Sequence, residues 1–381
     1  MDWSLSAAEV EFREAARSWL RGHVPSSSLP SMDTAAGFRV HREWERELFD
    51  GGWAAVTWPR RFGGRDASVV EWLLFEEEYY AAGAPGRVTQ NGVFLLGPTL
   101  LEVGSEEQKE RLLRPMAAAE ETWAQAWSEP DAGSDLAAVR SAARRADGGW
   151  RLSGQKTWTT RGAFADRAFG LFRTDPKSER HRGLTYFMFP LRGEGVTVNP
   201  VRRLDGAPGF AEVFLDDLFV GDADVIGEVG RGWQVAMSTT TSERGMTLRS
   251  PGRFLQAARE LAELRRRRGN AAFDAAVVDC LVDAAAYRAR GLTSAGRALA
   301  RQPIGAEASV DKLFWSQLDL RIQRTALALL GPAAPLAEGA EAEAGRWLDR
   351  FLFALAGPIY AGTNEIQRNI IAQRVLGMPR P

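Results

Sequence analysis

The sequence predicts an α+β protein whose strands lie between two helical regions. Apolar residues recur at helical spacing up to about residue 120 and again from Gly232 to the end of the chain. Between Trp123 and Val225, short alternating runs are separated by Gly, Asp and Pro, which is typical of strands. One hydrophobic core is too small for a chain of 381 residues. We therefore expect three domains, at residues 1–122, 123–230 and 231–381.

Helices in the N-terminal region are predicted by their capping signals. Ser6 and Glu9 have the spacing of a capping box at the start of the first helix. Further helices are expected over residues 39–49 and 69–80, each ending before glycines. Ser105 is expected to cap another helix, whose acidic first turn favours the helix dipole.

The middle region predicts a compact antiparallel barrel or sandwich. Its β-type runs are GWRLSGQKTWTT, RAFGLFRTD, GLTYFMFPL, VTVNPVRRLDG and AEVFLDDLFV. After Gly232, long Ala-, Leu- and Arg-rich segments predict helices that break near Gly269, Gly291, Gly305 and Gly331.

Composition excludes several classes of function. A net charge of −1 gives no electrostatic case for binding nucleic acid or an anionic membrane. No apolar run reaches the roughly 18 residues of a membrane span, so we expect a soluble protein. Cys280 is the one cysteine, which excludes an intrachain disulfide, fits a cytoplasmic location and predicts a small core residue. His23, His41 and His181 are too widely spaced to indicate a metal site.

Two stretches combine hydroxyl groups with turns or aromatic rings. In WSEPDAGSD, the hydroxyls of Ser128 and Ser134 could bind a flat polar heterocycle or a phosphate. In GQKTWTT, Trp158 beside threonine hydroxyls suits stacking and hydrogen bonding to a planar ring. Taken singly, these stretches are equally compatible with an ordinary turn and an amphipathic strand.

A third stretch, PIYAGTNEIQRNIIAQRVLG, predicts a tight turn followed by a helix. Thr363 or Asn364 can cap this helix, and Gln367 is available to bond back to the capping backbone. A capped helix start offers N–H groups to an anion or a polarised carbonyl. Ala361, at the entrance, is neither acid, base nor nucleophile, and an ordinary capped helix remains the alternative.

The chain resembles the acyl-CoA dehydrogenase family nearly end to end. GSEEQKERLLRPMAAAEETWAQAWSEPDAGSDL resembles the first family signature, LSGQKTWTTRGAFAD the central flavin segment, and PIYAGTNEIQRNIIAQRVLG the C-terminal signature. The resemblance implies an N-terminal helical domain, a middle β domain and a C-terminal four-helix bundle. It also implies FAD, an acyl-CoA substrate, electron-transfer flavoprotein as electron acceptor, and a homodimer or tetramer whose subunits complete each other's flavin sites.

The resemblance also implies which residues form the site. Ser128 would bond the pyrimidine end of the flavin, Trp158 would lie against the ring, and Thr160 would bond near N5. The implied cofactor-binding set is Gln125, Trp127, Ser128, Ser134, Trp158, Thr160, Thr363 and Glu365. The implied substrate-binding set is Ser134, Arg244, Tyr360, Ala361 and Gly362.

The position of the catalytic base departs from many members of the family. Many carry a glutamate where this chain has Ala361, whereas others place it on a helix of the C-terminal domain, just before an arginine. Here TTTSERGMTLRS puts Glu243 before Arg244, as in many bacterial members, including ones acting on sterol side chains. From the residues alone Glu243 is a solvated helix residue. With the resemblance it becomes the expected base.

The implied reaction is dehydrogenation of an acyl-CoA to the trans-2-enoyl-CoA. Glu243 would remove the α-proton as hydride leaves the β-carbon for flavin N5. The flavin ribityl hydroxyl and the backbone N–H of residue 361 would stabilise the enolate oxygen. Alternatives on the same fold are an acyl-CoA oxidase, a flavin monooxygenase-like relative, and a non-catalytic subunit.

Two segments depart from the family pattern and point to a mixed assembly. LRRRRGNAAFD and LALLGPAAPL stand where many members carry Arg-x-x-Phe-Gly and Gln-x-x-Gly-Gly, which complete the neighbour's FAD site. Some bacterial relatives work as mixed pairs, so this chain is also a candidate for a heteromer with a related subunit. A base on the helix is compatible with branched, long or bulky acyl chains.

Overall fold

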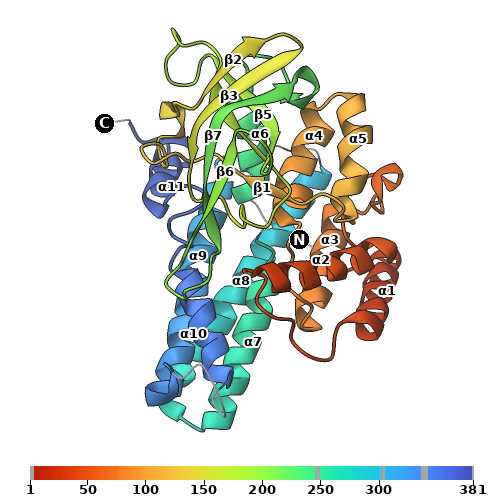
Figure 1. Ribbon diagram of the computed structural model, residues 1–381. Coiled ribbons are helices and arrows are strands. Elements are labelled where there is room, and N and C mark those ends of the chain that lie inside the picture. Colours follow the sequence, from red (N-terminus) through yellow and green to blue (C-terminus); the bar gives the residue numbers. More distant parts are fainter. Residues whose placement is uncertain (1–3, 245–248, 301, 303–304, 336–341, 380–381) are drawn as a thin grey trace. The chain divides into compact units, whose positions relative to one another are not determined.

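The computed structural model describes residues 4–244, 249–300, 302, 305–335 and 342–379. Helices occupy both ends of this part of the chain and a sheet of eight strands lies between them in sequence (Figure 1). The predicted α+β class is therefore confirmed.

The helices are α1 (Ala7–His23), α2 (Ala35–Asp50), α3 (Val69–Ala81), α4 (Gly97–Val103), α5 (Glu106–Ala117), α6 (Gly232–Arg244), α7 (Pro251–Arg268), α8 (Asp274–Leu299), α9 (Ala308–Leu330), α10 (Ala342–Ala354) and α11 (Asn364–Ile370). The strands are β1 (Trp123–Gln125), β2 (Ala142–Ala146), β3 (Gly149–Lys156), β4 (Arg167–Arg173), β5 (Leu184–Pro190), β6 (Val196–Val201), β7 (Phe210–Gly221) and β8 (Val225–Ile226).

Side-chain caps fix the starts of several helices, as the sequence predicts. The hydroxyl of Ser6 accepts from the N–H of Glu9, and the Glu9 carboxylate accepts from the N–H of Ser6 at 2.8 Å. Ser105 forms the same reciprocal box with Gln108 at the start of α5. Helix α2 begins four residues earlier than predicted, because Thr34 caps it by accepting from the N–H of Gly37.

Packing divides the chain into two compact units. The helical unit comprises residues 1–24, 67–84 and 244–381, and the sheet unit comprises residues 25–66 and 85–243. Helices α1 and α3 therefore group with the C-terminal helices rather than with α2. The three domain ranges proposed from sequence stay a prediction, because this grouping follows packing rather than order along the chain.

The core of the helical unit is built by α7, α8, α9 and α10, which confirms the predicted C-terminal helical bundle. Phe254, Tyr287, Trp315 and Trp347 bring one large aromatic ring from each helix into a single cluster. Cys280 on α8 is fully buried in the same cluster, and burial raises the pKa of its thiol. It is thus a small core residue, as expected.

The sheet has the order β6-β7-β3-β2-β4-β5-β8, with β1 added beside β4. Most pairings are antiparallel, in agreement with the prediction. The pairings of β4 with β1 and with β2 are parallel instead. As a result, β1 ends beside the middle of β4, with Gln125 opposite Phe169.

One glycine is required where β3 changes register against β7. Gly154 follows the irregularity after Leu152 and has a φ of +144°, a conformation that side-chain-bearing residues rarely adopt. A Cβ at this position would lie 2.3 Å from the hydroxyl oxygen of Ser141. The close approach brings β3 against the segment that follows WSEPDAGSD.

None of the helices in the described ranges combines the length and the apolar character that crossing a bilayer requires.

Candidate functional site

The two hydroxyl-bearing segments predicted from sequence lie side by side in the sheet unit. One follows the end of β1 and the other follows the end of β3. The N–H of Thr157 donates to the carbonyl oxygen of Ser128 at 2.8 Å, so the two backbones are in direct contact. Ser128 and Trp158, predicted to contact opposite parts of one ring system, therefore lie within a few residues of one backbone hydrogen bond.

A buried ion pair joins these segments from below. The Lys156 ammonium donates to the Glu129 carboxylate and to the Leu171 carbonyl oxygen, both at 2.7 Å, and its side chain is fully buried. Glu129 also accepts from the backbone N–H groups of Arg140 at 2.6 Å and Ser141 at 2.9 Å. The pair thus fixes both ends of the WSEPDAGSD turn to the end of β3.

Both members of the pair are charged. Burial alone would raise the pKa of the Glu129 carboxyl, but the Lys156 charge and the backbone donor at Arg140 hold it below its ordinary value. Burial lowers the pKa of the Lys156 ammonium, and Glu129 opposes that shift. We assign the ionised form because Lys156 faces two acceptors and Glu129 faces only donors.

Trp158 presents its indole to solvent although it is a large apolar side chain. The side chain is 60% exposed, and its backbone lies in the left-handed region with φ of +56°. Phe210 supports the ring edge-on, with the centroids 5.8 Å apart. An exposed indole held by an unusual backbone conformation is suited to stacking on a planar ligand.

The hydroxyl groups around this indole are unused. Within the described part of the chain, the side chains of Ser128, Ser134 and Thr160 make no hydrogen bond, and neither does that of Gln125. Ser134 is exposed, whereas Ser128 and Thr160 are half-buried. Such donors and acceptors beside an exposed indole fit the flavin that the sequence predicts, because an isoalloxazine offers a flat face and a polar edge.

A hydrogen-bonded chain leads from this place to α6. Trp127 donates from Nε1 to the Tyr186 hydroxyl at 3.1 Å, and that hydroxyl lies 3.3 Å from the Thr239 hydroxyl on α6. Thr239 is in turn 2.8 Å from the Thr99 hydroxyl, and all four side chains are buried. Trp127, predicted to bind the cofactor, is therefore fixed from behind and connected to the helix that carries Glu243.

The loop carrying Thr160 is anchored by a second buried ion pair. Arg161, the next residue, donates from Nε to Asp33 at 2.8 Å, and Arg203 reaches the other oxygen of Asp33 at 2.7 Å. Burial lowers the pKa of Arg203, but Asp205 and Asp33 outweigh it and raise the pKa above its ordinary value. One carboxylate thereby positions the loop from two sides.

The predicted C-terminal turn has its own supporting layer within the helical unit. Tyr360 stacks on Trp315 with centroids 5.7 Å apart, and the Arg249 guanidinium lies 5.1 Å from the Tyr360 ring. The chain then passes through two left-handed residues, Ala361 with φ of +56° and Gly362 with φ of +79°. This turn leads directly into α11.

The caps of α11 differ in one detail from the prediction. Thr363 is the N-cap and its side chain accepts from the N–H of Ile366 at 3.2 Å. Gln367 is fully buried and donates to the carbonyl oxygens of Ala361 at 3.0 Å and Gly362 at 3.2 Å. Its amide therefore holds the turn by its carbonyls, so the expected bond to the capping backbone forms one or two residues earlier.

Asn364 is a structural residue of the turn. It is buried, and its side-chain oxygen accepts from Lys312 at 2.8 Å and Ser316 at 3.1 Å, both on α9. Glu365 points the other way, with a side chain 75% exposed beside Arg368. The N–H of Ala361 donates to no other residue in the described ranges, which leaves it available to a ligand.

Two expected site residues lie at the edge of the described structure. Glu243 and Arg244 belong to the last turn of α6, and their side chains lie outside the described part of the chain. The described residues also contain no group of His, Cys, Asp and Glu that could hold a metal ion.

Sequence patterns do not predict the supporting residues. Glu129, Lys156, Asp33 and Tyr186 act through partners far away in sequence, and no local spacing pairs them. The one available signal is Lys156, a charged residue at the end of an otherwise apolar-alternating strand.

Family models match almost the whole chain. Those described as the acyl-CoA dehydrogenase N-terminal, middle and C-terminal domains match residues 6–120, 124–218 and 230–376. Acyl-CoA dehydrogenase IpdE1 of Mycolicibacterium smegmatis is 38% identical over 97% of this chain and 98% of its own length. The protein of the same name from Mycobacterium tuberculosis is also 38% identical, with the same coverage.

Solved structures with a similar fold include two complexes. The Tcur3481-Tcur3483 steroid ACAD has a TM-score of 0.89 and 25% identity, and each chain is covered completely. The ChsE4-ChsE5 complex from Mycobacterium tuberculosis has a TM-score of 0.87 and 28% identity, again with complete coverage of both chains.

Proposed function

Because the chain belongs to the acyl-CoA dehydrogenase family of oxidoreductases, we propose that it converts an acyl-CoA thioester to the trans-2-enoyl-CoA with FAD as cofactor. One observation carries the proposal. The hydrogen-bonded chain from Trp127 through Tyr186 ends at Thr239, four residues before Glu243. Helix periodicity places positions 239 and 243 on the same face of α6, which is the face turned toward the cofactor-binding segment.

The unused groups at the ends of β1 and β3 form the cofactor site. Ser128 and Thr160 bond the polar edge of the flavin, and the exposed indole of Trp158 lies against its ring. Gln125, Trp127 and Ser134 complete this set, and Thr363 and Glu365 contact the cofactor of a neighbouring subunit. The bound cofactor supplies the acceptor for the hydride that leaves the β-carbon.

Glu243 is the general base that removes the α-proton of the thioester. The proton is weakly acidic, so negative charge develops on the thioester oxygen and requires a preorganised donor. The N–H of Ala361 supplies that donor, since it is unused and held by the left-handed turn. A backbone donor does not depend on the side chain, which is why alanine serves here. Arg244, Tyr360 and Gly362 line the same thioester site, and Ser134 contacts the CoA arm.

The test is anaerobic bleaching of the bound flavin by acyl-CoA esters in a Glu243→Gln variant. We expect the variant to remain yellow with flavin reduction lost by a factor of about 10³ or more. Glu228→Gln is the matched control, because Glu228 precedes α6 with a side chain 84% exposed. Normal bleaching by the Glu243 variant would exclude this base. A colourless wild-type protein would instead support the non-catalytic subunit.

Two further measurements separate the remaining alternatives. Stoichiometric peroxide formation during turnover in air would favour an oxidase over a dehydrogenase that reduces electron-transfer flavoprotein. The titles of two similar structures name complexes, and one names a steroid ACAD, which supports a heteromer and a bulky ring-bearing acyl group. We accordingly place steroid-derived acyl-CoA esters in the substrate panel, beside straight and branched chains, and expect the bulky esters to bleach the flavin fastest. The single buried cysteine supports a cytoplasmic location.

A further inference from the structure

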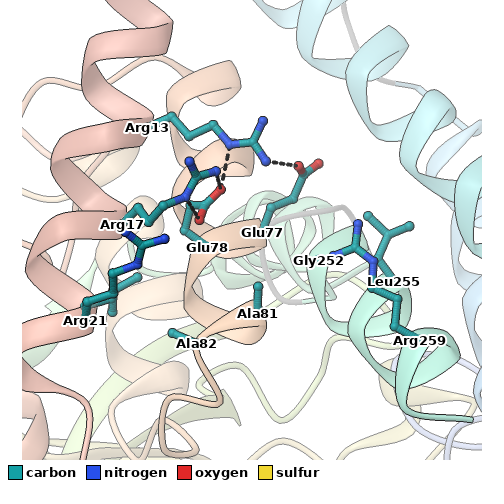
Figure 2. Close-up of a pocket in the computed structure, with 11 residues that line it drawn as sticks. Arg13, Arg17, Arg21, Glu77, Glu78, Ala81, Ala82, Gly252, Leu255 and Arg259 are labelled. Carbon is teal, nitrogen blue, oxygen red and sulfur yellow. Dashed lines mark hydrogen bonds and ion pairs between the residues drawn. The ribbon is translucent and has the colours of Figure 1, made fainter. Parts of the chain in front are cut away.

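A cavity of about 340 Å³ opens between α1, α3 and α7 of the helical unit (Figure 2). The three helices contribute different chemistry. Helix α1 supplies arginines, α3 supplies carboxylates and alanines, and α7 supplies an apolar stretch that ends in an arginine. The lining residues are Arg13, Arg17, Leu20, Arg21, Glu77, Glu78, Ala81, Ala82, Gly252, Leu255 and Arg259.

Three arginines form a row along one side of the cavity. Arg13, Arg17 and Arg21 are spaced by four residues, so helix geometry places them on one face of α1. Arg259 lies on the opposite side, on the face of α7 that also carries Gly252 and Leu255 (Figure 2). The cavity is therefore bordered by guanidinium groups on both sides.

The carboxylates between these sides are already occupied. Glu78 accepts from Arg13 at 2.6 Å and from Arg17 at 2.8 Å, and Glu77 pairs with Arg288. Burial alone would raise the pKa of Glu78, but the hydrogen bonds from Arg17 and Arg13 lower it below its ordinary value. Glu78 is therefore ionised at neutral pH and saturated by its two arginines.

Arg21 and Arg259 are left over. Neither makes a hydrogen bond or an ion pair with any residue in the described ranges. The cluster contains five guanidinium groups, of Arg13, Arg17, Arg21, Arg259 and Arg288, against the three carboxylates of Glu14, Glu77 and Glu78. Two positive charges therefore remain without compensation beside the cavity.

The floor of the cavity is apolar. Leu20 is fully buried, and Leu255, Ala81 and Ala82 complete a surface without hydrogen-bonding side chains. Helix α7 approaches α3 closely here, because a Cβ on Gly252 would lie 2.7 Å from the Glu76 carbonyl oxygen. An anion with an organic body suits this combination, since the body covers the floor while the charge meets the arginines.

We propose that this cavity binds a phosphate-bearing small molecule, whose phosphate group is held between Arg21 and Arg259. Guanidinium groups offer paired N–H donors that match phosphate oxygens, and two of them neutralise a dianion. The site is built entirely within the helical unit. It is independent of the proposed reaction and uses none of the residues assigned to it.

The experiment measures binding of three probes to the full chain by calorimetry at low salt. The probes are inorganic phosphate, pyrophosphate and AMP. We expect AMP to bind more tightly than inorganic phosphate, because it also covers the apolar floor, and added salt to weaken both. Tighter binding of pyrophosphate than of AMP would support the arginines as the phosphate site and assign the ligand as an inorganic polyphosphate.

Substitutions then locate the site. Arg21→Gln and Arg259→Gln should each weaken AMP binding about fivefold, and the double variant at least about tenfold. Arg324→Gln is the matched control, an exposed arginine on α9 without a partner among the described residues, and should leave binding unchanged. Equal thermal unfolding midpoints would show that the variants fold. Equal AMP affinity in the double variant, or no binding of any probe at about 1 mM, would overturn the proposal.

Discussion

The Lys156 ammonium lies 2.7 Å from the Glu129 carboxylate, and both side chains are buried at the place where the two predicted flavin segments meet. Each residue is adjacent to a proposed cofactor ligand or separated from one by a single residue. Glu129 follows Ser128, and Lys156 precedes Trp158 by two positions. A structural ion pair and the proposed cofactor site therefore share the same short stretches of backbone.

Replacing Lys156 by methionine should destabilise the protein strongly. The substitution keeps the volume but leaves the Glu129 carboxylate buried without its cation, which costs about 3–5 kcal/mol in comparable pairs. The free energy of unfolding is measured by urea denaturation. Lys177→Met, in an exposed loop, is the control and should change it by no more than about 0.5 kcal/mol. A similar small change for Lys156→Met would show that the pair contributes little.

The same pair predicts a pH dependence in the acid range. The pKa of Glu129 in the folded protein lies below its ordinary value of 4.5, so its contribution to stability is present above about pH 4.5 and is lost as the pH falls toward the folded value. The Glu129→Gln variant lacks this titration. Its free energy of unfolding should therefore decline less steeply than that of the wild type between about pH 5 and pH 3. Parallel curves would assign the acid dependence to other carboxylates.

Gly154→Ala should impair both folding and cofactor binding. A methyl group there meets the Ser141 hydroxyl oxygen at 2.3 Å, and Ser141 belongs to the segment held by Glu129. Gly148→Ala is a matched control, because Gly148 also has a positive φ, +67°, but has nothing within 4 Å of its added Cβ. The control should cost about 1 kcal/mol, the price of the backbone conformation alone. We expect a larger loss for Gly154→Ala, together with weaker retention of flavin on gel filtration. Equal losses would place the effect in the backbone conformation rather than in the contact.

Asn364→Ala should loosen the turn that presents the N–H of Ala361. The substitution removes the acceptor shared by Lys312 and Ser316 and should lower the free energy of unfolding by about 1–3 kcal/mol. Asn369→Ala, exposed on the same helix, is the control. If the turn positions the thioester oxygen, flavin reduction by substrate should slow more than binding weakens. An unchanged reduction rate in a destabilised protein would limit Asn364 to a structural role.

Local signals in the sequence predicted the helices well and the supporting contacts poorly. Ser6, Ser105 and the helix over Val69–Ala81 follow from caps and periodicity, which depend on residues a few positions apart. The pairing of Lys156 with Glu129 depends on the parallel and antiparallel neighbours of β3 and β4, which no local pattern specifies. The row formed by Arg13, Arg17 and Arg21 is visible in the sequence, but its meaning depends on α3 and α7.

The two compact units also impose an order on synthesis. Residues 25–66 and 85–243 of the sheet unit are all made before the C-terminal helices, so this unit has its complete set of residues while the ribosome is still translating. Helices α1 and α3 must wait for α7, against which Gly252 packs at the Glu76 carbonyl, before their own unit can form. During that interval their apolar faces are uncovered, which makes the nascent chain a natural client for a chaperone that binds the N-terminal helices.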